Sequence, residues 1–183
     1  MNIESLLKSL ESTGLATVIR EGLYYFPLLE SFHVVGLAMV FGCVAIIDFR
    51  LLGWASTNRP FTRVFSDIMT GIWAAYALTI ATGTLMFTTN AVQYYGNSVF
   101  RAKMLMLVLA GINMLFFELT AGRVVRQADH TSPIPKTAKA TAALSLVFWI
   151  SIVFLGRWIG FTVTQTQVEE PAAEEMNFDD IFK

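Results

Sequence analysis

Charged residues are scarce in this sequence, and so are the residues from which most soluble enzymes build their sites. Only 15% of the residues are Asp, Glu, Lys or Arg, compared with about 25% in soluble domains. One cysteine and two histidines provide neither an intrachain disulfide nor a zinc motif of the usual spacing. A hydrolase triad, a phosphate-binding loop and a basic patch with interleaved aromatics are also missing. We therefore expect no stand-alone enzyme for soluble substrates and no nucleic-acid partner.

The sequence has long apolar runs instead, since 55% of its residues are hydrophobic. A helix that crosses the hydrocarbon core of a membrane needs about 20 predominantly apolar residues. Four stretches reach that length, at about residues 26–47, 68–88, 102–122 and 138–161. The predicted fold is all-α, an integral membrane protein whose residues 24–163 form a four-helix transmembrane bundle.

The two ends of the chain differ from the spans. Over residues 3–10 apolar side chains recur at helical spacing, while charged side chains take the other face of the helix. Residues 1–23 are therefore predicted to form an amphipathic helix at the membrane interface, broken at Gly14. Residues 164–183 are rich in acidic residues and are predicted to form a flexible tail.

Lysine and arginine are unequally distributed between the two sides of the predicted bundle. The loops after the first and third spans hold seven of these residues, and the opposite side holds five, spread over both tails and one loop. Because short cytoplasmic loops are enriched in Lys and Arg, we place both termini on the other side of the membrane. The predicted location is the bacterial inner membrane, with periplasmic termini and with His130 in a cytoplasmic loop.

Four ionisable residues fall near the periplasmic ends of three spans. Glu30 and His33 belong to the first span, and Lys103 to the third. Arg157 lies about one turn inside the end of the fourth span. An ionisable residue within a span is costly and usually faces the bundle interior or a wet cavity. These four residues are therefore predicted to converge on one outward-facing pocket, with an aromatic rim formed by Tyr94, Tyr95 and Trp158.

His33 is the candidate ligand in this pocket, because imidazole is a common axial ligand of haem b and also suits copper. His130 lies on the opposite side, so a second histidine would have to come from a partner subunit or a second copy. Alternatively, a methionine within the spans would supply the second ligand. The guanidinium of Arg157 is suited to clamp a haem propionate or a quinone headgroup. The structural alternatives are a His33 hydrogen-bonded to a neighbouring helix and an Arg157 that snorkels or pairs with Glu30.

A second polar group is predicted toward the cytoplasmic end of the bundle. Asp48 and Arg50 end the first span, while Asn113 and Glu118 lie in the third. Their predicted roles are proton relay or pairing of helices. The second span carries a small residue at every fourth position, which predicts a face for close helix packing rather than a site, formed by Gly71, Ala75, Thr79 and Gly83.

Several segments together resemble a family of small four-helix bacterial inner-membrane proteins of unknown function. They are Phe32-His33-Val-Val-Gly36-Leu-Ala, Asp48-Phe-Arg50-Leu-Leu-Gly53, Asn113, and Gly156-Arg157-Trp158-Ile-Gly160. The resemblance covers most of residues 24–161 and implies the four-span fold. It points to His33, Asp48, Arg50 and Arg157 as polar positions of the family. A looser likeness to cytochrome b561-like and copper-resistance membrane proteins rests on helix count and the intramembrane histidine.

The leading functional hypothesis is a membrane-anchor or electron-transfer subunit of an inner-membrane complex, an oxidoreductase subunit at most. It would bind haem b or quinone at Glu30, His33, Lys103 and Arg157. Its partners would be membrane lipids, other membrane or periplasmic subunits, and in one arrangement a second copy of the chain. Two alternatives remain: a non-catalytic scaffold, and a small transporter with a proton or copper path past His33, Asn113 and Glu118.

Overall fold

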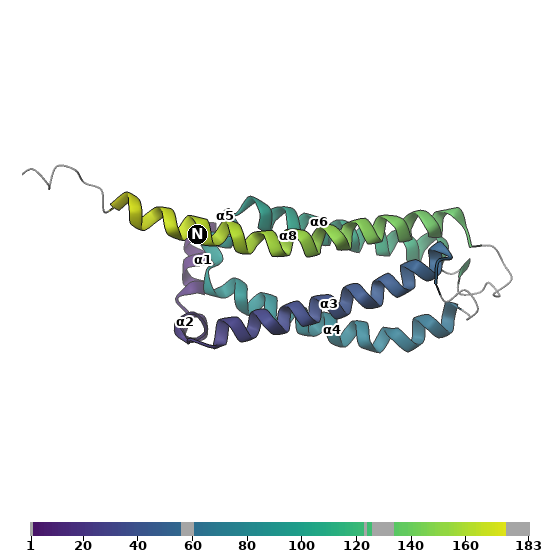
Figure 1. Ribbon diagram of the computed structural model, residues 1–183, viewed down its shortest axis with the longest axis horizontal. Helices are drawn as coiled ribbons and strands as arrows, with labels where there is room; N and C mark the ends of the chain where they lie inside the picture. Colours follow the sequence, from purple (N-terminus) through teal and green to yellow (C-terminus); the bar gives the residue numbers. More distant parts are fainter. Residues whose placement is uncertain (1, 56–60, 123, 126–133, 175–183) are drawn as a thin grey trace, which may run out of the picture.

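The computed structural model describes residues 2–55, 61–122, 124–125 and 134–174, and this part of the chain contains helices and no strand (Figure 1). In chain order the elements are α1 (Ile3–Glu11), α2 (Gly14–Glu21), α3 (Tyr25–Leu52), α4 (Phe61–Thr89), α5 (Ala91–Gly96), α6 (Ser98–Phe117), the π-helix η1 (Glu118–Gly122) and α8 (Lys136–Glu174). The predicted all-α class is confirmed.

Four helical segments are long and apolar enough to cross a membrane: Tyr25–Leu52, Thr70–Thr89, Ser98–Gly122 and Lys136–Thr162. They confirm a multi-pass membrane protein. Helix α3 continues past residue 47 to Leu52, and Gly53 follows it with a left-handed φ of 82°, which is typical of a glycine at a helix terminus. Helix α8 also continues beyond residue 161, through Glu174. Residues 162–170 contain no Gly or Pro, so the formed helix propagates over them at low cost; it also includes Pro171. Residues 175–183 of the predicted tail lie outside the described residues, as do Arg59, Arg123, Arg126 and His130.

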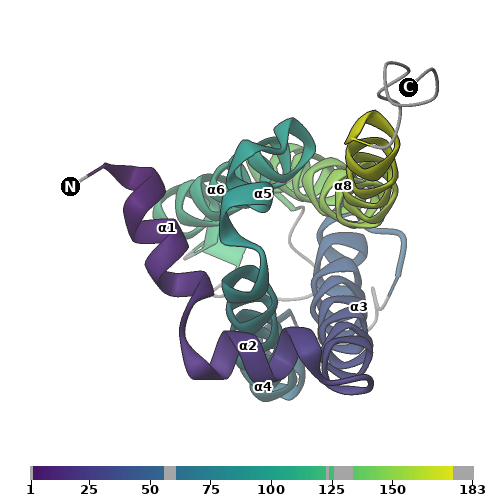
Figure 2. The same ribbon diagram turned by 90° about the vertical axis from the view of Figure 1, so that its left-hand side faces the viewer.

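The spans form two antiparallel hairpins, α3 with α4 and α6 with α8 (Figure 2). A further broad seam joins the hairpins where α3 packs on α8, whereas the described parts of α4 and α6 have no comparable contact. We call the end that carries α1, α2 and α5 the α5 end, and the opposite end the η1 end (Figure 1). The α3–α8 seam therefore connects the two halves of the bundle.

Glycines let α3 and α4 approach closely. A Cβ atom on Gly36 would lie 2.6 Å from Thr79 Oγ1 and 3.3 Å from the backbone oxygen of Ala75. Farther along the same interface, a Cβ on Gly71 would lie 3.9 Å from Cys43 Sγ. The small-residue face predicted for the second span is therefore the face that packs on α3, as expected for helices in lipid.

The N-terminal segment forms two short helices, neither of which spans the membrane. The break falls at Ser12 and Thr13, not at Gly14, which is the first residue of α2. The Thr13 hydroxyl accepts a hydrogen bond from the Ala16 amide, which is the usual way a threonine caps a helix. Apolar side chains are exposed along both helices, so the segment has an apolar surface that can lie in the membrane interface. They include Ile3, Leu6, Leu15 and Val18.

Two charged side chains of the N-terminal helices hold the corner between α4 and α5. Glu11 Oε1 accepts a hydrogen bond of 2.9 Å from the Val92 amide in the first turn of α5. Arg20 Nη1 donates a bond of 3.1 Å to the Thr89 carbonyl at the end of α4. Helix ends leave backbone groups without intrahelical partners, and these charged side chains satisfy one at each side of the corner.

Removal of the Glu11 carboxylate is expected to loosen this corner. Glu11→Ala should lower the free energy of unfolding by about 1 kcal/mol, the typical effect of losing a helix cap, and should speed amide exchange at Val92. The control is Glu4→Ala, because Glu4 forms only an exposed pair with Lys8, with a 2.8 Å separation between Nζ and Oε1. Equal exchange rates at Val92 in both variants would contradict the capping role.

Candidate membrane-embedded binding site

His33 lies on the face of α3 that packs on α4. Its Nδ1 is 3.0 Å from the Thr79 carbonyl oxygen and 3.1 Å from Thr82 Oγ1. A carbonyl oxygen only accepts hydrogen bonds, so Nδ1 carries the proton and donates it. The Thr82 hydroxyl donates to the Leu78 carbonyl at 2.7 Å, which leaves its oxygen to accept from the same Nδ1. In the neutral imidazole, Nε2 therefore carries the lone pair.

The ring of His33 rests on a glycine. A Cβ on Gly83 would lie 2.9 Å from Cε1 and 3.2 Å from Nδ1 of the imidazole, closer than ordinary packing allows. Gly83 thus provides the space for the ring, and the Thr79 carbonyl fixes its rotation. The sequence marked Gly83 as part of a packing face but did not connect it with His33, because the rotation of α3 relative to α4 is set only by packing.

Lys103 comes to the same region from the other hairpin. Its side chain lies along α8 at Gly156, where a Cβ would be 3.3 Å from Nζ. The ammonium is also close enough to act electrostatically on the His33 imidazole. Among the residues whose side chains the structure describes, no carboxylate forms an ion pair with Lys103. The α5 end thus holds an imidazole and a cation that has no ion-pair partner among the described side chains.

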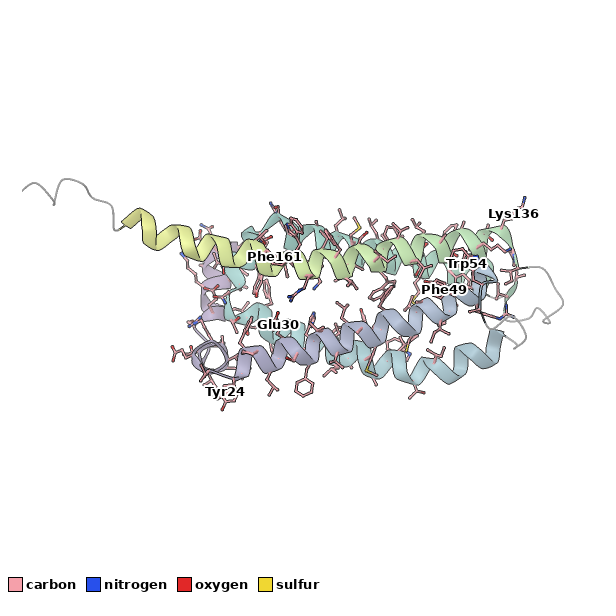
Figure 3. All side chains as sticks on the ribbon, in the orientation of Figure 1. Tyr24, Glu30, Phe49, Trp54, Lys136 and Phe161 are labelled. Atoms are coloured by element: carbon pink, nitrogen blue, oxygen red, sulfur yellow. The ribbon has the colours of Figure 1, made fainter. Side chains whose placement is uncertain are left out.

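Glu30 and Tyr94 lie near this pair. Glu30 is one turn before His33, on the side of α3 that faces α8 (Figure 3), and is exposed. Tyr94, on α5, packs its ring against Phe87 and Phe100, with centroid separations of 6.4 and 5.6 Å. Burial raises the pKa of the Tyr94 phenol, and the Glu30 carboxylate raises it further. Tyr94 is therefore a neutral hydroxyl group beside the site.

Arg157 follows the glycine that faces Lys103, and its side chain is exposed. Successive residues of an α-helix point about 100° apart. Arg157 therefore projects from α8 in a different direction from Gly156. The neighbouring Trp158 is also exposed and lies 5.5 Å from Phe154 and 6.4 Å from Phe161 between ring centroids. Of the four predicted residues, His33 and Lys103 are the two with a described mutual interaction.

The predicted residues of the second polar group occupy the half of the bundle toward the η1 end. Asn113 Nδ2 donates a 3.0 Å hydrogen bond to the Thr141 carbonyl, so this amide joins α6 to α8. Asp48 and Arg50 are buried, and Glu118 begins the π-helix. Within the described residues, no three His, Cys, Asp or Glu side chains gather as a metal site.

Four membrane-length helices define a multi-pass α-helical membrane protein, in which His33 of one hairpin and Lys103 of the other interact electrostatically. Residues 13–162 match the profile of a protein family described as "Family of unknown function (DUF6644)", and the chain belongs to that family. The predicted resemblance to a family of unknown function is thereby confirmed. Neither a curated protein nor a solved structure matches the chain.

Proposed function

We propose that this protein is a membrane subunit of an inner-membrane redox complex and that it binds a quinone headgroup between His33 and Lys103. The observation that carries the proposal is the placement of these two side chains. The His33 imidazole and the Lys103 ammonium, which has no ion-pair partner among the described side chains, come from opposite hairpins and interact electrostatically. Both termini, and this site, would face the periplasm.

The two groups match the two redox forms of the ligand. The Lys103 ammonium donates a hydrogen bond to a quinone carbonyl oxygen, and His33 Nε2 accepts one from a quinol hydroxyl. On oxidation the quinol passes two electrons to a redox centre of a partner subunit. Its first proton moves to Nε2, and the second follows by the same route after the first has left. The backbone hydrogen bond to Nδ1 keeps Nε2 in place for both steps.

The surface of the spans supports a role as a subunit. Within the four apolar windows, only 11–22% of the residues are buried inside the chain. The remaining surface must be covered by lipid or by another membrane protein, since apolar side chains are costly in water. A complex of several chains would also supply the redox centre that the proposed reaction requires.

One observation favours haem b as a second candidate ligand. A metal-ligating histidine usually donates its other ring N–H to a carbonyl or carboxylate, which fixes the tautomer. His33 has this arrangement, with Nδ1–H on the Thr79 carbonyl. The single membrane-embedded histidine would supply one axial ligand, and the other would come from a methionine, a partner subunit or a second copy.

Purification in mild detergent, followed by solvent extraction and a reduced-minus-oxidised visible spectrum, separates these candidates. Copurifying quinone with a featureless spectrum supports the quinone site, whereas a Soret shift with α and β bands supports haem. Absence of both, together with no binding of a short-chain ubiquinone analogue, would overturn the proposal. Copurification of other proteins without quinone or haem would favour the alternative function, a non-catalytic scaffold.

Lys103→Met tests the polar contact without introducing a cavity. We expect the dissociation constant of the ubiquinone analogue, followed by quenching of tryptophan fluorescence, to rise about 10- to 100-fold, because a hydrogen bond from a charged donor is worth about 1.5–3 kcal/mol. Lys139→Met is the control, since Lys139 is exposed on α8 near the η1 end. Equal affinities in wild type and Lys103→Met would rule out this contact.

A further inference from the structure

A buried carboxyl group lies in the α3–α8 seam, away from the His33–Lys103 site. Asp48 is only 5% exposed, and its Oδ2 atom is buried with no hydrogen-bond partner among the described residues. The Ser145 hydroxyl of α8 donates a hydrogen bond to this carboxyl. The carboxyl thus sits at the seam that joins the two hairpins.

Among the described residues, an apolar cluster lies toward the η1 end from Asp48. Leu51, one turn along α3, belongs to a cluster with Phe117 and Ala142, residues of α6 and α8 that are 9% and 2% exposed. On the other side, Asn113 bonds the Thr141 carbonyl one turn before Ser145. This described amide is therefore engaged with the backbone of α8 and not with the Asp48 carboxyl.

Among the residues that the structure describes, no charged side chain of α3, η1 or α8 forms an ion pair with Asp48. On α3, Arg50 is two residues away and so projects from a different side of the helix. On η1, Glu118 has a partner, and on α8 the cations Lys136 and Lys139 are exposed. No lysine or arginine among the described residues acts on the Asp48 carboxyl.

We propose that Asp48 is a membrane-embedded proton-binding site, whose carboxyl carries a proton while α3 and α8 are packed together. An ionised carboxylate with an unpartnered oxygen in an apolar seam is very costly, and a bound proton removes the charge. The irregular turn of η1 lies against the same cluster, and π-helical turns are frequent at functional sites. This proton site is independent of the quinone proposal, because it involves neither His33 nor Lys103.

Infrared spectroscopy of the full chain in lipid nanodiscs tests this proposal. At neutral pH we expect the carbonyl-stretch band of a protonated carboxylic acid, shifted by hydrogen–deuterium exchange and by carboxyl-13C labelling of aspartate. Asp48→Asn should remove the band. Glu118→Gln is the control and should keep it, because Glu118 lies on η1 and not on α3.

If Asp48→Asn does not fold, the aspartate label in the wild-type protein still shows whether the protonated carboxyl belongs to an aspartate. A missing band, a band insensitive to the aspartate label, or a band that persists in folded Asp48→Asn would each overturn the proposal. Loss of the band on addition of Na⁺ at constant pH would also overturn it, because the carboxyl would then bind a metal cation in preference to a proton.

Discussion

Gly36→Leu is expected to separate α3 from α4 and to cause the largest loss of stability of any substitution considered. Even the Cβ atom would come within 2.6 Å of Thr79 Oγ1 and 3.3 Å of the Ala75 carbonyl oxygen. The hydroxyl could rotate, but the carbonyl belongs to the backbone of α4 and cannot yield without moving the helix. Insertion of extra carbons into a packed interface costs about 1–3 kcal/mol, and a contact with backbone should reach at least about 3 kcal/mol.

The measurement is the free energy of unfolding in mixed detergent, followed by circular dichroism. Gly42→Leu is the matched control on the same helix, because a Cβ there meets nothing within 4 Å. The free energy of unfolding of Gly42→Leu should stay close to that of the wild-type protein. Similar losses in both variants would show that helix propensity or lipid exposure, and not the α3–α4 contact, determines the effect.

Gly83→Val is expected to displace the His33 imidazole and to weaken ligand binding about 100-fold, by the loss of a positioned hydrogen-bonding group. A Cβ at this position would lie 2.9 Å from Cε1 of the ring. The ring must then turn away, which breaks the bond between Nδ1 and the Thr79 carbonyl and moves Nε2. The valine methyl groups would occupy the space that the ring now fills.

Titration of the purified variant with the ubiquinone analogue gives the affinity, and circular dichroism verifies that the helices remain. Gly111→Val on α6 is the control, because a Cβ there has no neighbour within 4 Å. Unchanged affinity in Gly83→Val would mean that the position of the imidazole is irrelevant to the ligand. Loss of affinity in both variants would point to a general effect on the bundle.

Gly36 and Gly83 have different roles: Gly36 affects the packing of two helices, and Gly83 affects the position of one side chain. A Cβ on Gly36 would meet the backbone of α4 as well as the Thr79 side chain, so its substitution acts on the whole hairpin. Gly83 meets only the side chain of His33 at close range, so its substitution acts on one ring. A protein in which Gly83→Val binds poorly but unfolds almost like wild type would support a binding role for His33 over a purely structural one.

The sequence by itself determined the membrane class, the four spans and the packing face of the second span. These follow from local patterns: a span needs a continuous apolar run, and small residues at every fourth position always share one helix face. Polar residues inside the spans were identified for the same reason, because each stands out against an apolar background. The sequence also contains the signal for a helix that continues past residue 161, because no Gly or Pro occurs between residue 161 and Pro171.

Only the tertiary structure decided which polar residues meet. The rotation of each helix depends on the fit of its neighbours, so the sequence could not show that Lys103 faces Gly156 while Arg157 projects elsewhere. The bond from the Val92 amide to Glu11 joins residues 81 positions apart, and the unpartnered oxygen of Asp48 depends on what α8 places opposite it. Contacts between distant segments are set by packing of whole helices, and no local pattern encodes them.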